Sequence, residues 1–117
     1  MEPIYNHLGR TIAWLKNNTI YDTIPRPRAF IRQRVIYTYE GRYIGQFEHG
    51  FFRDKQGHAV AFMQGASGGP IPPVTEVSPV PPIPPIPPIE PILSIPPIPP
   101  IPSLSWSSLE WEDFLRG

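Results

Sequence analysis

The chain has 117 residues, of which 19 are proline and none is cysteine, and its ten basic residues balance its ten acidic ones. This length limits it to one small domain with appendages, and the lack of cysteine excludes disulfides and thiolate chemistry. Because a formal net charge of zero gives no overall attraction to a polyanion, we do not expect a nucleic-acid partner.

Residues 4–67 form four consecutive repeats of equal length without a gap, which begin at Ile4, Ile20, Ile36 and Phe52. The sixth residue of each repeat is Gly or Pro, as is typical of turns. The tenth residue is always small and the twelfth always apolar. Side chains alternate along a strand, so these two positions share a face. Each repeat therefore predicts one β-hairpin.

Four hairpins in succession can share a core that one hairpin lacks. We predict an all-β fold in which four 16-residue β-hairpin repeats form a compact pseudo-four-fold module over residues 1–69. The small tenth residues would lie near its axis, and they are Ala13, Ala29, Gly45 and Ala61. An ordinary antiparallel meander with accidental periodicity is the alternative.

The pattern I-Y-x-x-x-G-R-x-I-A-x-L, read from Ile4 to Leu15, resembles the four-fold beta-flower domain. The resemblance covers roughly residues 1–69 and implies a small bacterial module of four hairpin petals, but no activity. The second repeat departs from the pattern. There, Pro25 and Pro27 replace the turn glycine and its second neighbour, and Arg28 replaces an aliphatic residue.

The second strand face of the repeats is also apolar, whereas a small sheet normally turns one polar face to water. Its residues are Ile12, Trp14, Ile44, Val60 and Phe62, together with Tyr5, Tyr21 and Tyr37 at the second position of three repeats. Exposed patches of this kind mark interfaces, so we predict an interaction surface here. The alternative is that this layer completes the same small core.

A basic cluster lies in the second repeat, where four arginines share parity with Phe30: Arg26, Arg28, Arg32 and Arg34. On one strand face they would suit phosphates, with Phe30 stacking on a base, or an acidic peptide. The alternative is a solvated edge that discourages aggregation. Residues 1–70 carry nine basic and five acidic residues, and residues 71–117 carry one and five. We therefore expect the two parts to meet.

Every third residue from Ile71 to Leu104 is aliphatic, which gives twelve positions in one series. Polyproline II has three residues per turn, so these side chains would form a continuous stripe. The stripe includes Ile83, Ile86, Ile89, Ile98 and Ile101. Disordered linkers are poor in aliphatics, so we predict that residues 70–104 form an ordered polyproline II segment whose stripe is buried. A low-complexity expansion is the alternative.

The length of this segment bears on where it packs. It would span roughly 105 Å when straight, whereas a 70-residue domain is roughly 30 Å across. The segment must therefore bend, cross neighbouring subunits or bundle with other copies. Because twelve aliphatic side chains need a cover, we expect homo-oligomerisation.

Residues 105–117 predict an acidic, amphipathic C-terminal anchor with a short helix. Ser107 and Glu110 fit a capping box, and Gly117 is a suitable stop. The apolar residues of this segment are Trp106, Leu109, Trp111, Phe114 and Leu115. We expect the anchor to dock on a partner or on the arginine cluster; a frayed terminus is the alternative.

Catalytic chemistry finds no support in the residue inventory. His7, His49 and His58 lack metal-ligand spacing, and no nucleotide-binding or hydrolase motif occurs. Asp22 and Asp54 recur at the third position of their repeats and are interpreted as turn-capping residues. We therefore assign no catalytic, cofactor or metal site.

The pattern as a whole predicts a non-enzymatic structural or interaction protein that self-assembles through its proline-rich arm and C-terminal anchor. Its expected partner is itself, with another protein as the second choice. A small-ligand or anion-binding module that uses the aromatic and basic petal face is the alternative. With no signal-peptide pattern and no apolar run long enough to cross a bilayer, we expect a soluble cytoplasmic protein without a membrane span.

Overall fold

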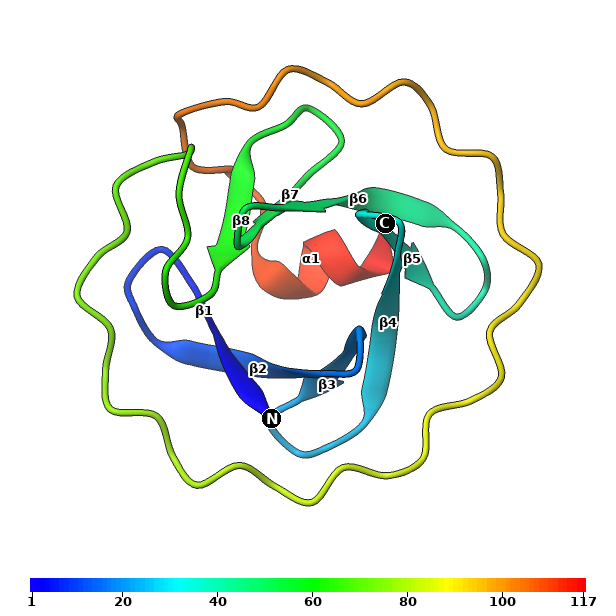
Figure 1. Cartoon of the computed structure of the whole chain (residues 1–117), viewed down its shortest axis with the longest axis horizontal. Coiled ribbons are helices and arrows are strands. Elements are labelled where there is room, and N and C mark those ends of the chain that lie inside the picture. Colours follow the sequence, from blue (N-terminus) through cyan, green and yellow to red (C-terminus); the bar gives the residue numbers. More distant parts are fainter.

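The computed structural model describes residues 1–117 and contains eight β-strands and one short helix. The strands are β1 (Glu2–Tyr5), β2 (Thr11–Lys16), β3 (Thr19–Asp22), β4 (Pro27–Arg32), β5 (Val35–Thr38), β6 (Tyr43–Glu48), β7 (Phe51–Arg53) and β8 (Ala59–Phe62), and the helix is α1 (Trp111–Arg116). Each strand pairs antiparallel with the next, and β8 pairs with β1 to close a barrel (Figure 1). The prediction of an all-β fold with a C-terminal helix is confirmed.

Two-residue turns connect β2 to β3, β4 to β5 and β6 to β7. Both turn residues have positive φ in each case, at Asn17–Asn18, Gln33–Arg34 and His49–Gly50. Such turns match the twist of paired strands, and asparagine or glycine, which tolerate positive φ, occupy three of these six positions.

The turns inside each repeat, which join β1 to β2, β3 to β4, β5 to β6 and β7 to β8, begin at the third residue of the repeat. Asp54 Oδ1 accepts the N–H groups of Gln56 and His58 at 2.9 and 3.0 Å, so the turn-capping interpretation of Asp54 is confirmed. The Asp22 carboxylate instead accepts hydrogen bonds from Arg26 and Arg28. In that turn Pro25 also replaces the glycine whose N–H donates to the third-position carbonyl in the other three repeats.

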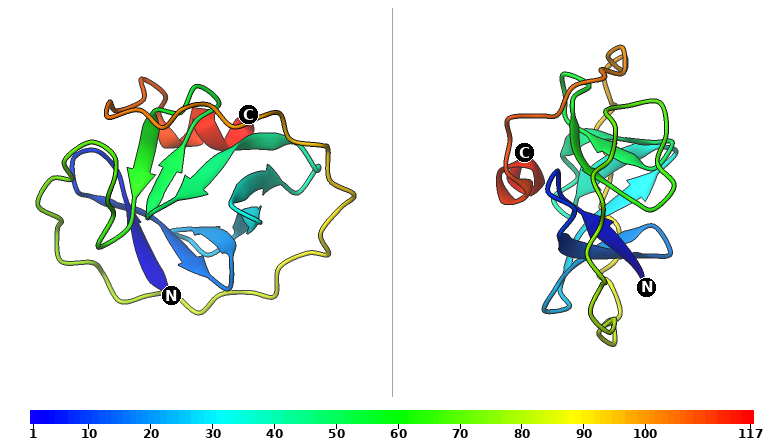
Figure 2. Two further views of the ribbon diagram at one scale, coloured as in Figure 1. Left: turned by 45° about the horizontal axis from the view of Figure 1, so that its top comes forward. Right: turned by 90° about the vertical axis from the view of Figure 1, so that its left-hand side faces the viewer.

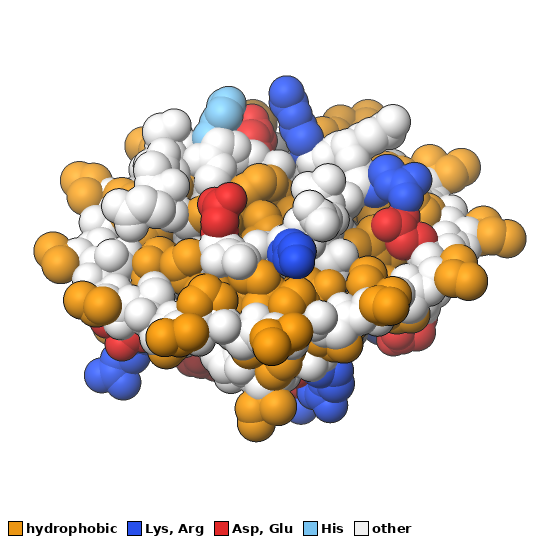
Figure 3. Space-filling view, turned by 60° about the horizontal axis from the view of Figure 1, so that its bottom comes forward, with side chains coloured by type: hydrophobic (Ala, Val, Ile, Leu, Met, Phe, Trp, Pro, Cys, Tyr) orange, Lys and Arg blue, Asp and Glu red, His pale blue; other side chains and the backbone are white.

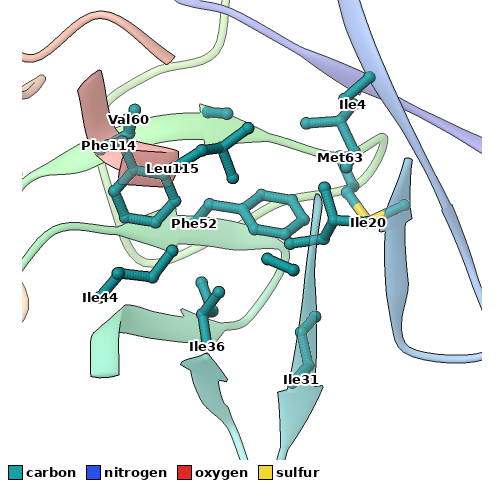
Figure 4. Close-up of a cluster of buried hydrophobic side chains, with 13 residues drawn as sticks. Ile4, Ile20, Ile31, Ile36, Ile44, Phe52, Val60, Met63, Phe114 and Leu115 are labelled. Carbon is teal, nitrogen blue, oxygen red and sulfur yellow. The ribbon is translucent and has the colours of Figure 1, made fainter. Parts of the chain in front are cut away.

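The first and tenth positions of the repeats supply seven of the thirteen residues in the core inside the barrel (Figure 4). Ile4, Ala13, Ile20, Ala29, Ile36, Phe52 and Ala61 are all fully buried. Gly45 completes the set, and a Cβ there would lie 2.0 Å from the Arg53 carbonyl oxygen and 2.9 Å from Phe114 Cε1. The small tenth residues thus let the strands and α1 approach.

The ninth position of each repeat lies at an irregularity of strand pairing. In the first repeat Ile4 pairs with Ala13 and Tyr5 with Thr11, which leaves Ile12 unpaired as a bulge, and the other three repeats have the same shift. A bulge re-aims its side chain. Ile44 and Val60 therefore belong to the inner core, and the prediction that they share the outer face with Trp14 and Phe62 is wrong.

The helix α1 covers one end of the barrel, as the edge-on view shows (Figure 2). Phe114 and Leu115 are buried in the barrel core, and Gly117 ends the helix with φ of 80°. The predicted capping box is wrong. The N-cap is Glu110, three residues after Ser107, and it has no side-chain cap. The Ser107 hydroxyl instead accepts the Leu109 N–H at 3.1 Å and donates to Asp54 Oδ2 at 2.6 Å.

Residues 70–104, which we name the belt, contain neither helix nor strand. The belt leaves the barrel after β8, runs once around its outside and returns to the same side before α1 (Figures 1 and 2). Every hairpin therefore has the belt outside it and the apolar core inside it.

We expect Ala29→Leu to lower the free energy of unfolding by roughly 1–3 kcal/mol, because three added carbons have no space beside Ile20 in a filled core. Urea unfolding measures this loss. Lys16→Leu, at an exposed strand end, is the matched control. A wild-type unfolding midpoint for Ala29→Leu would contradict this placement.

Candidate interaction surface

The belt is tied to the barrel by backbone hydrogen bonds at three of the four petals. The N–H groups of Glu76, Ser94 and Ser103 donate to carbonyl oxygens at the sixth position of repeats one, three and four. The acceptors are Gly9, Gly41 and Gly57, at 2.9, 3.2 and 3.1 Å. Three of the belt residues that keep an N–H thus use it against the barrel, one at each of these petals.

Glycine is required at these sixth positions for two reasons. Gly9, Gly41 and Gly57 have φ between 79° and 89°, which disfavours other residues. A Cβ would also lie 2.2–2.6 Å from the belt carbonyl oxygen that faces each of them. The turn glycines of the repeat are therefore the docking points of the belt.

The tyrosines at the second position of the repeats form another set of contacts with the belt. Tyr21 Oη donates to the Pro85 carbonyl at 3.2 Å and Tyr37 Oη to the Ser94 carbonyl at 3.5 Å. Tyr5 Oη pairs with Ser78 Oγ at 3.0 Å. All three rings are buried. The predicted interaction surface on this face is an internal one, because the chain's own belt covers it.

Trp14 and Phe62, predicted for the same surface, are likewise almost fully buried. Phe62 packs with Tyr5 at a ring-centroid distance of 5.5 Å and with Trp106 at 5.9 Å. The barrel closes here through one residue pair, Tyr5 with Phe62. Trp106 therefore packs beside the strand pair that has the fewest paired residues, β1 with β8.

Arg53 takes the place of tyrosine at the second position of the fourth repeat and joins both ends of the belt. Its Nη1 donates to the Ser103 and Gly57 carbonyls at 2.8 and 2.7 Å, and its Nη2 donates to the Gly68 carbonyl at 3.1 Å. The side chain is buried and stacks over Phe51, and this burial lowers the pKa of Arg53. The Arg53 guanidinium therefore hydrogen-bonds both to the chain just before the belt and to the last residues of the belt.

These contacts reveal a period in the belt that the sequence analysis missed. Residues in the same relation to successive petals are nine apart, at Glu76, Pro85, Ser94 and Ser103. The signal in the sequence is the break in the proline pattern at Glu76, Ser94 and Ser103. Nine belt residues thus correspond to one complete repeat of the barrel.

The arginine cluster does not form one face. Phe30 is buried, and Arg34 lies in a β-turn at the opposite end of β4 from Arg26. Arg26 and Arg28 pair with Asp22 at 3.0 Å, and Arg32 pairs with Glu90 of the belt. The prediction of a single basic face is wrong, because a bulge and a turn interrupt its parity.

The expected meeting of the basic part and the acidic tail does occur, within one chain. Arg28 Nη2 donates to Glu112 of α1 at 2.7 Å, and Arg42 donates to the Arg116 carbonyl at 3.1 Å. Trp111 packs edge-on against Phe52 of the barrel. The C-terminal anchor therefore docks on its own barrel, mainly through Phe114 and one arginine of the cluster.

The aliphatic stripe faces outward, and Figure 3 shows apolar side chains protruding along the part of the edge that is in view. Its twelve side chains are 74–97% exposed, and they include Ile83, Ile86, Ile89, Ile98 and Ile101. Within one chain the prediction of a buried stripe is wrong. The belt's barrel side is occupied by its carbonyl and N–H groups and by rings such as Pro91 and Pro100, which lie against the turn glycines. The aliphatic position is the one left pointing away.

The family model of the 4-fold beta flower protein matches residues 2–115. The chain belongs to the 4-fold beta flower family. The match extends past residue 69, where the resemblance seen in the sequence ended, and takes in the belt and α1. Comparison with curated proteins found no match, and comparison with solved structures found none either.

Two further features of this beta flower chain concern ions and membranes. No group of three or more His, Asp or Glu side chains is placed to hold a metal ion. The structure has no helix with the length and apolar character that crossing a membrane requires.

We expect Arg53→Met to destabilise the fold by about 2–5 kcal/mol, because it leaves the buried Gly57 carbonyl and the part-buried Ser103 and Gly68 carbonyls without their charged donor. Amide exchange at Ser103 should quicken most, since this residue lies at the released end of the belt. Arg10→Met is the control, as the Arg10 guanidinium has no hydrogen bond or ion pair. Equal exchange at Ser103 in both variants would refute the role of Arg53.

The ion pair between α1 and β4 predicts a pH dependence. The hydrogen bond from Arg28 lowers the pKa of Glu112 below its ordinary value of 4.5. The stabilisation is therefore complete above the ordinary pKa and is lost as the pH falls through the lowered one. Glu112 is 46% exposed, so solvent screening keeps the effect small.

Glu112→Gln should lower the melting temperature at neutral pH and have little effect below the folded-state pKa, where the wild-type carboxylate is already protonated. Melting curves between about pH 7 and pH 2 check this. Glu110→Gln, on an exposed residue with no ion pair, is the control. A constant gap between Glu112→Gln and the wild type would show that the charge is not involved.

Proposed function

We propose that this beta flower protein is a non-enzymatic structural protein that assembles with copies of itself, and that the outward aliphatic stripe of the belt is its assembly surface. One observation carries the proposal: twelve aliphatic side chains in an unbroken series are exposed around the edge of the molecule. The belt itself, held at both ends and at all four petals, serves as the scaffold that presents them.

The extent of the stripe supports association. Monomeric proteins rarely expose a contiguous apolar patch larger than a few hundred Å². Fully burying one such side chain is worth about 1.5–3 kcal/mol, so even a contact that covers a few of them offsets much of the cost of association. Its position on one continuous segment makes the stripe a surface rather than scattered exposure.

The composition of the belt supports the same function. Proline fixes φ, and a proline-rich chain in the polyproline II conformation loses little entropy when a partner covers it. The aliphatic positions stay in phase with the three-residue turn from Ile71 to Leu104. Such a belt would act as a rigid surface with side chains at fixed intervals.

The C-terminal anchor has an indirect part in this proposal. Since Phe114 and Leu115 lie inside their own barrel, α1 fixes the end of the belt rather than reaching another copy. The alternative, a ligand-binding petal face, gains no specific support. Its tyrosines lie under the belt, and Arg26, Arg28 and Arg32 have acidic partners within the chain.

We expect the wild-type protein to exceed the monomer mass in light scattering. Ile86→Ser with Ile98→Ser should weaken its association at least tenfold, since each removes an exposed side chain whose burial is worth more than about 1.4 kcal/mol. Leu8→Ser with Ile24→Ser is the matched control, because both residues are exposed aliphatics outside the belt. A monomeric wild type, or equal effects of the two pairs, would overturn the proposal.

A further inference from the structure

We infer that copies of this chain associate side by side in one plane, edge against edge, with the belt of one copy against the belt of the next. This inference rests on the proposed self-assembly and adds its geometry. The occupant of the exposed stripe is a second copy of the chain, and the flat faces of the molecule stay free.

The shape of the molecule restricts how its stripe can be covered. The principal extents are 38 × 35 × 21 Å, so the molecule is a disc, and the belt follows its outer edge (Figures 1 and 2). A partner on one flat face would reach none of the outward side chains. Because the edge is convex, any one neighbour covers only an arc of it. Several neighbours in the plane of the disc are therefore needed to cover the whole stripe.

The spacing of the stripe makes two copies complementary. Successive aliphatic side chains are three residues apart, or about 9 Å in a polyproline II chain. A gap of this width between two side chains accepts one aliphatic side chain from a facing stripe of equal spacing. A second copy has that spacing by identity, and the belt segment at each petal brings three such side chains.

The charges are arranged so that belts can meet without repulsion. The belt has two charged residues, and both bind the barrel: Glu76 accepts the Thr11 N–H at 2.6 Å, and Glu90 pairs with Arg32. The ends of the barrel differ from this edge. Glu110 and Asp113 are exposed near α1, and Lys16 and Arg34 are exposed in the turns at the other end. Stacking through the faces would desolvate these charges, whereas the charges that edge contact meets on the belt are already bound to the barrel.

Paired cysteines test the geometry, since the natural chain has no cysteine. Ile83→Cys with Ile101→Cys places thiols on the outer edge at petals two and four, and Lys16→Cys with Asp113→Cys places one on each flat face. All four residues are exposed, so both variants should fold. Mild oxidation of the full-length proteins should link the edge pair into a ladder of dimers, trimers and longer products, and leave the face pair mostly unlinked.

Microscopy of the assemblies provides a second readout that needs no substitution. Side-by-side copies should repeat at about the disc width of 35–38 Å in a layer one disc thick, and stacked copies should repeat at about 21 Å. Edge-linked ladders together with the wider repeat would establish the inference.

The outcomes separate the two proposals. Assemblies that are linked through the face pair, or that repeat at the disc thickness, would overturn the side-by-side geometry and leave self-assembly standing. A wild-type monomer with unlinked edge cysteines would overturn both. So would a protein that stays monomeric in buffer but floats with phosphatidylcholine vesicles through Ile83 and Ile86, because lipid would then be the occupant of the stripe.

Discussion

The belt can encircle the barrel only because its length per petal equals a quarter of the outer edge. Nine residues of a proline-rich chain extend about 28 Å, and four such lengths make a closed path with a diameter of about 36 Å. The disc measures 38 × 35 Å in its plane. A belt much shorter than this would not return to Arg53, and a longer one would not keep its N–H groups opposite Gly9, Gly41 and Gly57. The contacts that hold the belt depend on this match.

The match also determines which side of the belt remains free. The belt sequence repeats in threes, and the barrel takes up the side that carries the carbonyl groups bound by Tyr21 and Tyr37. The aliphatic position always falls on the outer side, because three divides nine and each petal meets the belt in the same phase. The nine-residue spacing of the contacts that dock the belt therefore also leaves the twelve aliphatic side chains exposed. A chain selected only for a cover over its aromatic face would have no reason to keep Ile or Val there.

Much of this architecture can be predicted from the sequence, and the parts that cannot have identifiable causes. The repeat period and the small tenth residue place Ala13, Ala29 and Ala61 in the core, because alternation along a strand is a local property. The bulge at Ile12 interrupts that alternation, and a pattern of alternating residues does not predict where such a bulge occurs. The proline-rich sequence gives the extended length of the segment. When this length is compared with the width of the domain, it predicts contact with other subunits. Comparison with the circumference of the domain would have suggested a belt. Arg53 was missed because it breaks the tyrosine column, and its partners lie 15 and 50 residues away.

The second petal shows how the two periods constrain each other. At its sixth position Pro25 replaces the glycine whose carbonyl elsewhere accepts a belt N–H. Pro25 keeps this carbonyl, but Pro85 at the corresponding belt position has no N–H to donate, so this backbone hydrogen bond is missing. The two changes are compatible, because neither leaves a buried donor without a partner. Side chains hold the belt instead, through Tyr21 to the Pro85 carbonyl and Arg32 to Glu90. The departure of this repeat from the glycine pattern is therefore matched far along the chain, in the belt, as expected if both segments fold as one structure.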